Sequence, residues 1–161
     1  MKHNDKFSCY LGFDDELAHL IEAGADLIIG SHPHVIQKMI WHPPPDGNKD
    51  RVIIYSLGNF VSNQRKPGTD GGAMVHIKFK KEEDSFVVSD AGYYLTWVYT
   101  PETDNSKRYY ILPCYEFEDD STFFNNGNDY GKMKEFIRNS RRLLVNQNIN
   151  VRAVSYTHLT L

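Results

Sequence analysis

A chain of 161 residues with a net charge of −3 and 40% hydrophobic residues has the size and apolar content of one domain, or of a large part of one. The mild acidic balance gives no support to nucleic-acid binding, which usually shows as a clustered basic face. No apolar run approaches the roughly 20 residues that span a bilayer. The opening segment, MKHNDKFSCYLGFDDE, lacks the apolar stretch of a signal peptide.

The two cysteines, Cys9 and Cys114, lie far apart in the sequence and have no close Cys or His at zinc-site spacing. One disulfide and two free thiols are both compatible with this pattern. The cysteines therefore leave the redox compartment open.

The segment 14–24, DDELAHLIEAG, predicts a helix. Acidic residues at its start suit an N-terminal cap and the helix dipole, and Gly24 suits a left-handed C-terminal position. His19 is expected to face solvent. The apolar face recurs at helical spacing, at Leu17, Leu20 and Ile21.

The apolar run Leu27, Ile28 and Ile29 follows directly and predicts a short strand that is buried on both faces and ends at Gly30. A helix, a glycine turn and a buried strand form half of a βαβ unit. In open α/β sheets, ligands collect beyond the carboxyl ends of the strands. The segment that follows, Ser-His-Pro-His, lies at such an end.

Two β-rich runs, 35–41 and 51–60, flank the turn-forming segment HPPPDGNKD and predict a hairpin or a strand–loop–strand unit. The second run is broken at Gly58 within SLGNF. A polar, glycine-containing loop is expected over 62–72.

The rest of the chain predicts three further strands and a last helix. The strands are expected over 73–80, 85–100 and 107–117, where β-branched and aromatic residues are frequent. The helix is expected over 128–145, with an apolar face made of Met133, Phe136, Ile137 and Leu144. Its basic residues alternate with apolar ones, which is typical of a solvated helix face.

His32 and His34 are the candidate metal ligands. In an extended segment two histidines at i and i+2 point the same way and can reach one metal ion or a close pair. Pro33 prevents the segment from continuing as a helix, and the glycine before it permits a sharp turn. The alternative is that His-Pro-His is a turn that binds no metal.

The segment AGADLIIGSHPHVIQ, followed by VIIYSLGNFVSNQ, resembles the CapA-type poly-γ-glutamate capsule synthesis proteins. The two motifs occur in the family's order, with about twenty residues between them, and the resemblance runs over roughly 12–152. It implies a mixed α/β (α+β) fold: the C-terminal part of a four-layer αββα metallophosphatase-like (calcineurin-like) sandwich.

The resemblance also implies a site. His32 and His34 match the last His-x-His of a centre that holds two divalent metal ions, for which manganese, iron or zinc are suitable. Ser56 and Asn59 lie where the next strand's end could line the same pocket; the alternative is that SLGNF is a structural turn. No catalytic acid is identified.

The family's earlier ligand elements have no match in this chain. We therefore expect residues 1–152 to be the C-terminal half of such a domain, inactive by itself, and Met1 to be an internal or assigned start. Residues 153–161 resemble a translated adaptor sequence and are expected to be a non-native tail, so His158 is not a candidate ligand.

Two functions are compatible with the resemblance. The first is metal-dependent hydrolysis or transfer in a capsule or poly-γ-glutamate biosynthesis protein, acting on an anionic polymer or a phosphate-like substrate. The second is a non-catalytic polymer-binding or assembly module of the cell envelope. Both imply that the full-length protein is extracytoplasmic and membrane-associated, with membrane synthesis or export machinery as a candidate partner.

Overall fold

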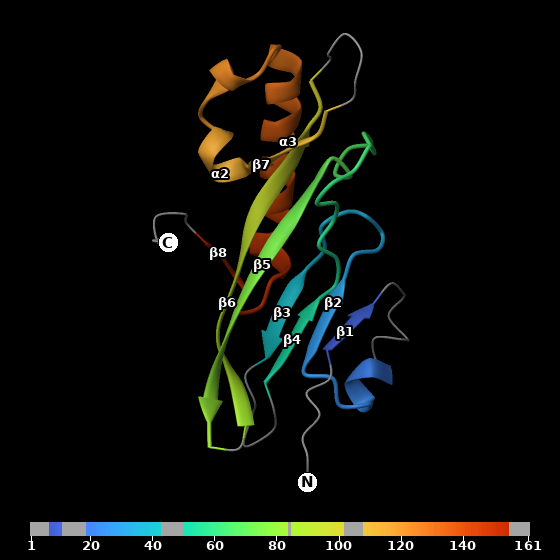
Figure 1. Ribbon diagram of the computed structural model, residues 1–161, viewed down its shortest axis with the longest axis vertical. Coiled ribbons are helices and arrows are strands. Elements are labelled where there is room, and N and C mark those ends of the chain that lie inside the picture. Colours follow the sequence, from blue (N-terminus) through green and yellow to red (C-terminus); the bar gives the residue numbers. More distant parts are fainter. Residues whose placement is uncertain (1–6, 11–18, 43–49, 84, 102–107, 155–161) are drawn as a thin grey trace.

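The first sheet of the molecule carries the His-Pro-His segment. The computed structural model describes residues 7–10, 19–42, 50–83, 85–101 and 108–154, and two mixed sheets organise this part of the chain (Figure 1). Three strands of the first sheet are parallel, and β3 is antiparallel to its neighbour β4. In spatial order the strands are β1 (Phe7–Tyr10), β2 (Leu27–Gly30), β4 (Arg51–Ile54) and β3 (Met39–His42).

The second sheet is built on a long hairpin that runs through most of the length of the molecule (Figure 1). This hairpin and β7 pair antiparallel, whereas β8 pairs parallel to β6. The strands are β5 (Gly71–Glu82), β6 (Ser85–Tyr99), β7 (Tyr110–Pro113) and β8 (Arg152–Ala153).

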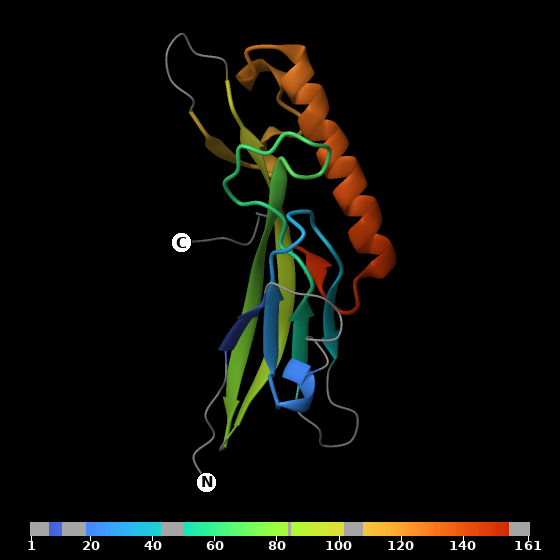
Figure 2. The same ribbon diagram turned by 90° about the vertical axis from the view of Figure 1, so that its right-hand side faces the viewer.

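The long helix α3 (Gly127–Gln147) lies along one side of the molecule (Figure 2). It begins where the Asn126 side chain accepts a hydrogen bond from the backbone N–H of Asp129, at 2.9 Å. All four residues of its predicted apolar face are buried, which confirms the helix prediction. The other helical pieces in the described part are residues 19–22, α2 (Cys114–Phe117) and the 3-10 turn η1 (Ser121–Phe123).

The strand prediction over 107–117 is wrong at its end. β7 stops at Pro113, and α2 follows at once, with the backbone N–H of Glu118 donating to the carbonyl of Cys114. Phe117 packs against Phe123, with 4.6 Å between ring centroids. Packing in this aromatic cluster outweighs the β preference of the segment.

The predictions for the first half are confirmed only in part. Both predicted strands are present but shorter: β3 is Met39–His42 where 35–41 was predicted, and β4 is Arg51–Ile54 where 51–60 was predicted. Residues 19–22 are helical and Gly24 has a φ of 87°, as expected at the end of a helix; residues 14–18 lie outside the described part. β3 and β4 form the expected antiparallel pair, although residues 43–49 of the connection are not among those described.

The two sheets share one core. A single cluster of buried side chains joins the first sheet, the second sheet and α3, and it includes Leu27, Val52, Ile54, Leu95, Trp97, Met133 and Phe136. A smaller cluster on the other face of the first sheet joins Ile28 and Ile53 to Leu20 and Ile21 of the short helix. β2 is therefore buried on both faces, as predicted. The mixed α/β class is confirmed, and the four-layer sandwich stays a prediction.

The predicted boundary after residue 152 falls inside β8. Val154 also lies against the second sheet, because its backbone N–H donates to the carbonyl of Tyr93 at 2.9 Å. Residues 155–161 lie outside the described part, and the non-native tail stays a prediction. Elsewhere, Cys114 is a buried free thiol. None of the described helices has the length and apolar character needed to cross a bilayer.

Candidate functional site

The site lies beyond the carboxyl ends of two parallel neighbours, β2 and β4. β2 ends at Gly30, and the His-Pro-His segment follows it; β4 ends at Ile54, and SLGNF follows. Because the strands are parallel and adjacent, both segments leave the sheet at the same edge. This position was predicted from the sequence for His32 and His34.

Backbone hydrogen bonds hold the two segments together. The N–H of Leu57 donates to the carbonyl of Gly30 at 2.9 Å, and the N–H of Gln37 donates to the carbonyl of Ser56 at 3.0 Å. A Cβ on Gly30 would collide with the Tyr55 carbonyl, so this approach requires a glycine. The His-Pro-His segment is thus fixed against the turn that carries Asn59.

The same turn is tied to the second sheet. The N–H of Asn59 donates to the carbonyl of Gly71 at 2.9 Å, and the N–H of Ala73 donates to the carbonyl of Leu57 at 2.8 Å. Gly58 has a φ of 71°, and a Cβ there would lie 2.9 Å from the Gly71 carbonyl oxygen. The site therefore rests on a junction between the two sheets.

His34 contacts Asn59 directly. The distance between His34 Nδ1 and Asn59 Oδ1 is 2.9 Å. His34 has a φ of 70°, in the left-handed region, where non-glycine residues are uncommon. Backbone conformations of this kind persist where surrounding contacts hold them, and they cluster at functional sites.

The contacts of Asn59 determine which nitrogen of His34 carries the proton. Asn59 Nδ2 donates to the Thr69 carbonyl at 2.8 Å and to Gln64 Oε1 at 3.0 Å. A backbone carbonyl can only accept, so this amide presents its oxygen to His34. His34 Nδ1 is therefore the N–H donor, and the lone pair of the neutral imidazole lies on Nε2. Metal-binding histidines commonly have this arrangement, with the second ring nitrogen held by an oxygen acceptor.

His32 lies beside His34. Their ring centroids are 5.6 Å apart, with an angle of 71° between the ring planes, and both side chains are exposed. The chain thus brings two imidazoles together at the surface, supported from behind by a buried amide. Both are accessible to a ligand from solvent.

Ser56 has a different environment. It is fully buried, and its Oγ accepts a hydrogen bond from the N–H of Gly58 at 3.2 Å. This contact stabilises the SLGNF turn, as expected if the motif is a structural turn. A role for Ser56 in lining a pocket stays a prediction.

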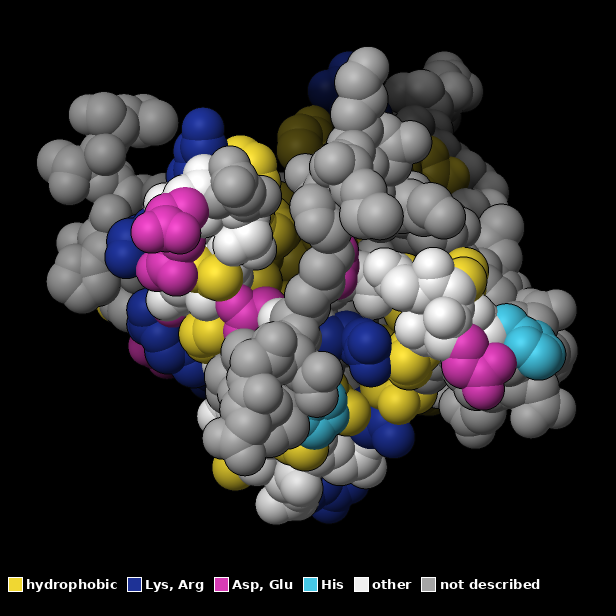
Figure 3. Space-filling view, turned by 90° about the horizontal axis from the view of Figure 1, so that it is seen from below, with side chains coloured by type: hydrophobic (Ala, Val, Ile, Leu, Met, Phe, Trp, Pro, Cys, Tyr) yellow, Lys and Arg dark blue, Asp and Glu magenta, His cyan; other side chains and the backbone are white. Residues whose placement is uncertain are grey.

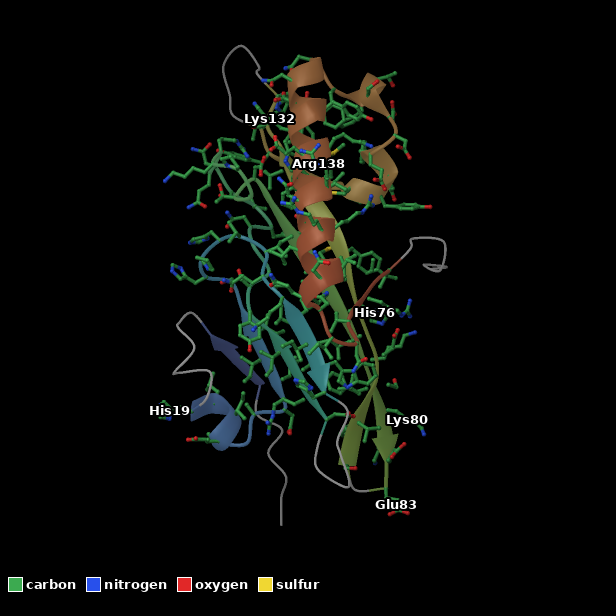
Figure 4. All side chains as sticks on the ribbon, turned by 180° about the vertical axis from the view of Figure 1, so that it is seen from behind. His19, His76, Lys80, Glu83, Lys132 and Arg138 are labelled. Atoms are coloured by element: carbon green, nitrogen blue, oxygen red, sulfur yellow. The ribbon has the colours of Figure 1, made fainter. Side chains whose placement is uncertain are left out.

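The two imidazoles could supply some, but not all, of the side-chain ligands that a metal ion needs. Within the described ranges, no group of three or more His, Cys, Asp or Glu side chains could hold a metal ion. His19 lies on the short helix and His76 on β5, away from the His-Pro-His segment (Figure 4). A centre of two metal ions would need further ligands from other parts of the protein.

Gln64 and Thr69 were not predicted as part of the site. They come from the polar loop 62–70, which reaches back to Asn59. Their side chains show no ligand spacing in the sequence, and Thr69 contributes only its backbone carbonyl. The contact depends on how the loop closes between β4 and β5.

The visible surface has mixed charge. Seen from below, side chains of both signs alternate with hydrophobic ones over the described residues (Figure 3). No large basic area dominates this face in the described part. The picture agrees with the mild net charge of the sequence.

The fold and the site define an α/β protein with an imidazole pair at the carboxyl edge of a sheet. Residues 14–64, which contain both motifs, match the family model for "Bacterial capsule synthesis protein PGA_cap". The chain is 45% identical over 61 residues to "Capsule biosynthesis protein CapA" of Bacillus anthracis, covering 38% of this chain and 13% of that protein. It is 43% identical over 60 residues to "PGA biosynthesis protein CapA" of Bacillus subtilis (strain 168), covering 37% and 14%. No solved structure matches the chain.

The chain is therefore related to the PGA_cap/CapA family of capsule synthesis proteins, through a partial match that contains the site. The match covers 13% and 14% of the length of these two relatives. The remainder of the resemblance over 12–152 stays a prediction.

Proposed function

We propose that this chain is part of a CapA-type protein in which His32 and His34 are ligands of a centre of two divalent metal ions, with manganese, iron or zinc as the candidates. The observation that carries the proposal is the hydrogen bond from His34 Nδ1 to Asn59 Oδ1, which leaves the Nε2 lone pair for a ligand. The domain around the site is proposed to be the four-layer metallophosphatase-like sandwich.

The proposed chemistry is hydrolysis or transfer at a phosphate-like or amide-type bond. A bound divalent ion supplies Lewis acidity and lowers the pKa of a bound water. The residues of this chain orient the site. Asn59 holds the Nδ1 proton of His34, and the backbone hydrogen bond from Leu57 to Gly30 fixes the segment that carries the imidazole pair. Because Asn59 already holds the His34 imidazole in position, little rearrangement of the side chain is needed when a metal ion binds.

The proposed substrate is an anionic surface polymer such as poly-γ-glutamate, or a phosphate-like group. The names of the two relatives, a capsule biosynthesis protein and a PGA biosynthesis protein, support this substrate class. The full-length protein is proposed to act outside the cytoplasm, at the membrane, beside the machinery that makes or exports the polymer.

A second candidate function is a binding or assembly module that holds polymer without turnover. The observation that favours it is the size of the donor set, since the described residues supply two imidazoles and no group of three ligands. In this case the exposed imidazoles would contact polymer or partner directly.

Elemental analysis of the purified full-length protein distinguishes the two functions. About two metal ions per chain, lost in His32→Ala and His34→Ala but retained in His76→Ala, would support the hydrolase and lead to assays on phosphoesters and γ-glutamyl amides. A folded full-length protein without bound metal would contradict the metal centre and favour the binding module.

A further inference from the structure

A hollow whose lining does not include the imidazole pair lies between the loop 62–70 and the first half of α3. Its volume is about 180 Å³, smaller than the roughly 300–1,000 Å³ of sites for drug-sized ligands. The loop lies beside the upper part of α3 in Figure 2, and Figure 4 shows Lys132 in the same region. Its polar lining consists of Arg65, Asp70, Lys132, Glu135, Asn139 and Ser140.

Asp70 is the unusual member of this lining. Its side chain is 8% exposed, and its Oδ2 accepts a hydrogen bond from Trp97 Nε1 at 3.0 Å. Its other oxygen, Oδ1, is buried and has no hydrogen-bond partner among the described residues. A buried carboxylate oxygen without a partner is costly, and most such groups in folded proteins are paired. Asp70 is among the residues that line the hollow, so a hydrogen-bond donor bound there is a candidate partner for this oxygen.

The backbone around Asp70 is held firmly. The Asp70 carbonyl accepts from the N–H of Val98 at 2.8 Å. Arg65 donates to the backbone carbonyls of Ser62, Gln64 and Val98, at 3.2 to 3.4 Å, and so ties the loop to the end of β6. The carboxylate is therefore fixed in place before any ligand binds, which reduces the entropy lost on binding.

The charges of the lining balance. Asp70 and Glu135 are acidic, and Arg65 and Lys132 are basic, so side chains of both signs line the hollow. A metal cation would meet two basic side chains, and the described residues contain no group of three metal ligands. A simple anion would meet the buried carboxylate. A small ligand with one charge of each sign is complementary to this lining.

We propose that the hollow binds a free α-amino acid, with its ammonium group donating to the Asp70 carboxylate and its carboxylate facing Lys132. Asp70 supplies a carboxylate that the indole of Trp97 holds in place. Lys132 is the mobile partner, because its one ion pair within the described chain, with Asp129 at 3.4 Å, lies on an exposed surface. This inference is independent of the proposed metal centre.

Trp97 provides the reporter for the test, since its indole N–H donates to the same carboxylate. In a Trp41→Phe background, glycine or L-alanine should change the Trp97 fluorescence in a saturable way. Methylammonium and acetate, which each carry one of the two charges, should bind at least tenfold more weakly. The variant Lys132→Gln should weaken the binding of both amino acids, and Arg138→Gln, on the same helix, should leave it unchanged.

Asp70→Asn gives the sharper comparison because it keeps an acceptor for Trp97 and offers the ligand an amide in place of a carboxylate. We expect at least a tenfold loss of amino-acid affinity, with folding checked by circular dichroism. If this variant does not fold, Lys132→Gln decides the question by itself. The absence of a saturable response to any amino acid, or equal binding by wild type and Lys132→Gln, would overturn the proposal and leave water as the partner of Oδ1.

Discussion

Asn59 Oδ1 lies 2.9 Å from His34 Nδ1, although the two residues are separated by 25 positions in the sequence. Parallel pairing of β2 with β4 brings them to the same edge, and the Thr69 carbonyl fixes the orientation of the amide. Asn59 thus sets both the position and the tautomer of the imidazole.

Replacing Asn59 with Ala should destabilise the chain by about 2–3 kcal/mol, because three hydrogen bonds of a buried side chain are lost. Chemical denaturation with urea measures this change. Asn63 is an exposed neighbour, and Asn63→Ala should change the stability by less than about 0.5 kcal/mol. Equal effects of the two substitutions would contradict the role given to Asn59.

Two glycines should respond in opposite ways to alanine. Gly58→Ala should cost more than about 2 kcal/mol, because Gly58 has a φ of 71° and its new Cβ would lie 2.9 Å from a backbone oxygen. Gly131 lies inside α3 with nothing within 4 Å of a new Cβ, so Gly131→Ala should stabilise by about 0.5–1 kcal/mol. Thermal melting of both variants measures the two changes in stability. A Gly58→Ala variant as stable as wild type would contradict the left-handed backbone conformation at Gly58.

Glu118 and Arg141 form a bidentate ion pair, with N–O distances of 2.7 and 2.8 Å. The hydrogen bond from Arg141 lowers the pKa of Glu118 below its ordinary value of 4.5. The pair's contribution is therefore fully present above pH 4.5 and is lost as the pH falls through the lower, folded-state pKa.

We expect Arg141→Gln to cost up to about 1 kcal/mol at pH 7, since Arg141 is about half exposed. The difference from wild type should shrink to zero in strong acid, whereas the exposed neighbour Arg142→Gln should have little effect at any pH. Denaturation curves from pH 7 to pH 2 measure both. A stability difference between wild type and Arg141→Gln that grew as the pH fell would contradict this role of the ion pair.

Cys114 should be unreactive in the folded chain. Burial raises the pKa of its thiol to about 12, and the residue is 1% exposed. While the thiol stays buried, only about one in 10⁴ would be ionised at pH 8. In a Cys9→Ser background, a disulfide reagent should label the chain only as fast as it unfolds. Rapid stoichiometric labelling under native conditions would contradict the buried position.

Local patterns in the sequence predicted the elements that depend on periodicity. The apolar run at 27–29 and the apolar face of α3 are examples, because burial of one face selects such spacing. The helical turn at 114–117 was missed because Phe117 packs against Phe123 and the main core, which are formed by residues distant from it or later in the chain. Contacts of this kind carry no local signal.

The sequence predicted the sheet edge at which the candidate site lies, but not the contacts that support its side chains. The order of helix, strand and glycine placed His32 and His34 at a sheet edge, whereas Ser56 and Asn59 were placed beside them by the family resemblance. The contact of Asn59 with Gln64 and Thr69, and of Asp70 with Trp97, depends on the path of the loop 62–70 over the junction of the two sheets. That path follows from long-range packing and has no motif of its own.

In the proposed site, His34 presents its Nε2 lone pair to solvent while Asn59 holds the Nδ1 proton. Two-bond ¹H–¹⁵N correlation spectra of the imidazoles, recorded at a pH at which they are neutral, report the tautomer directly. We predict that His34 is protonated at Nδ1 and unprotonated at Nε2, and that Asn59→Ala removes this preference. A wild-type His34 protonated at Nε2 would contradict this arrangement, because that nitrogen would then have no lone pair for a metal ion.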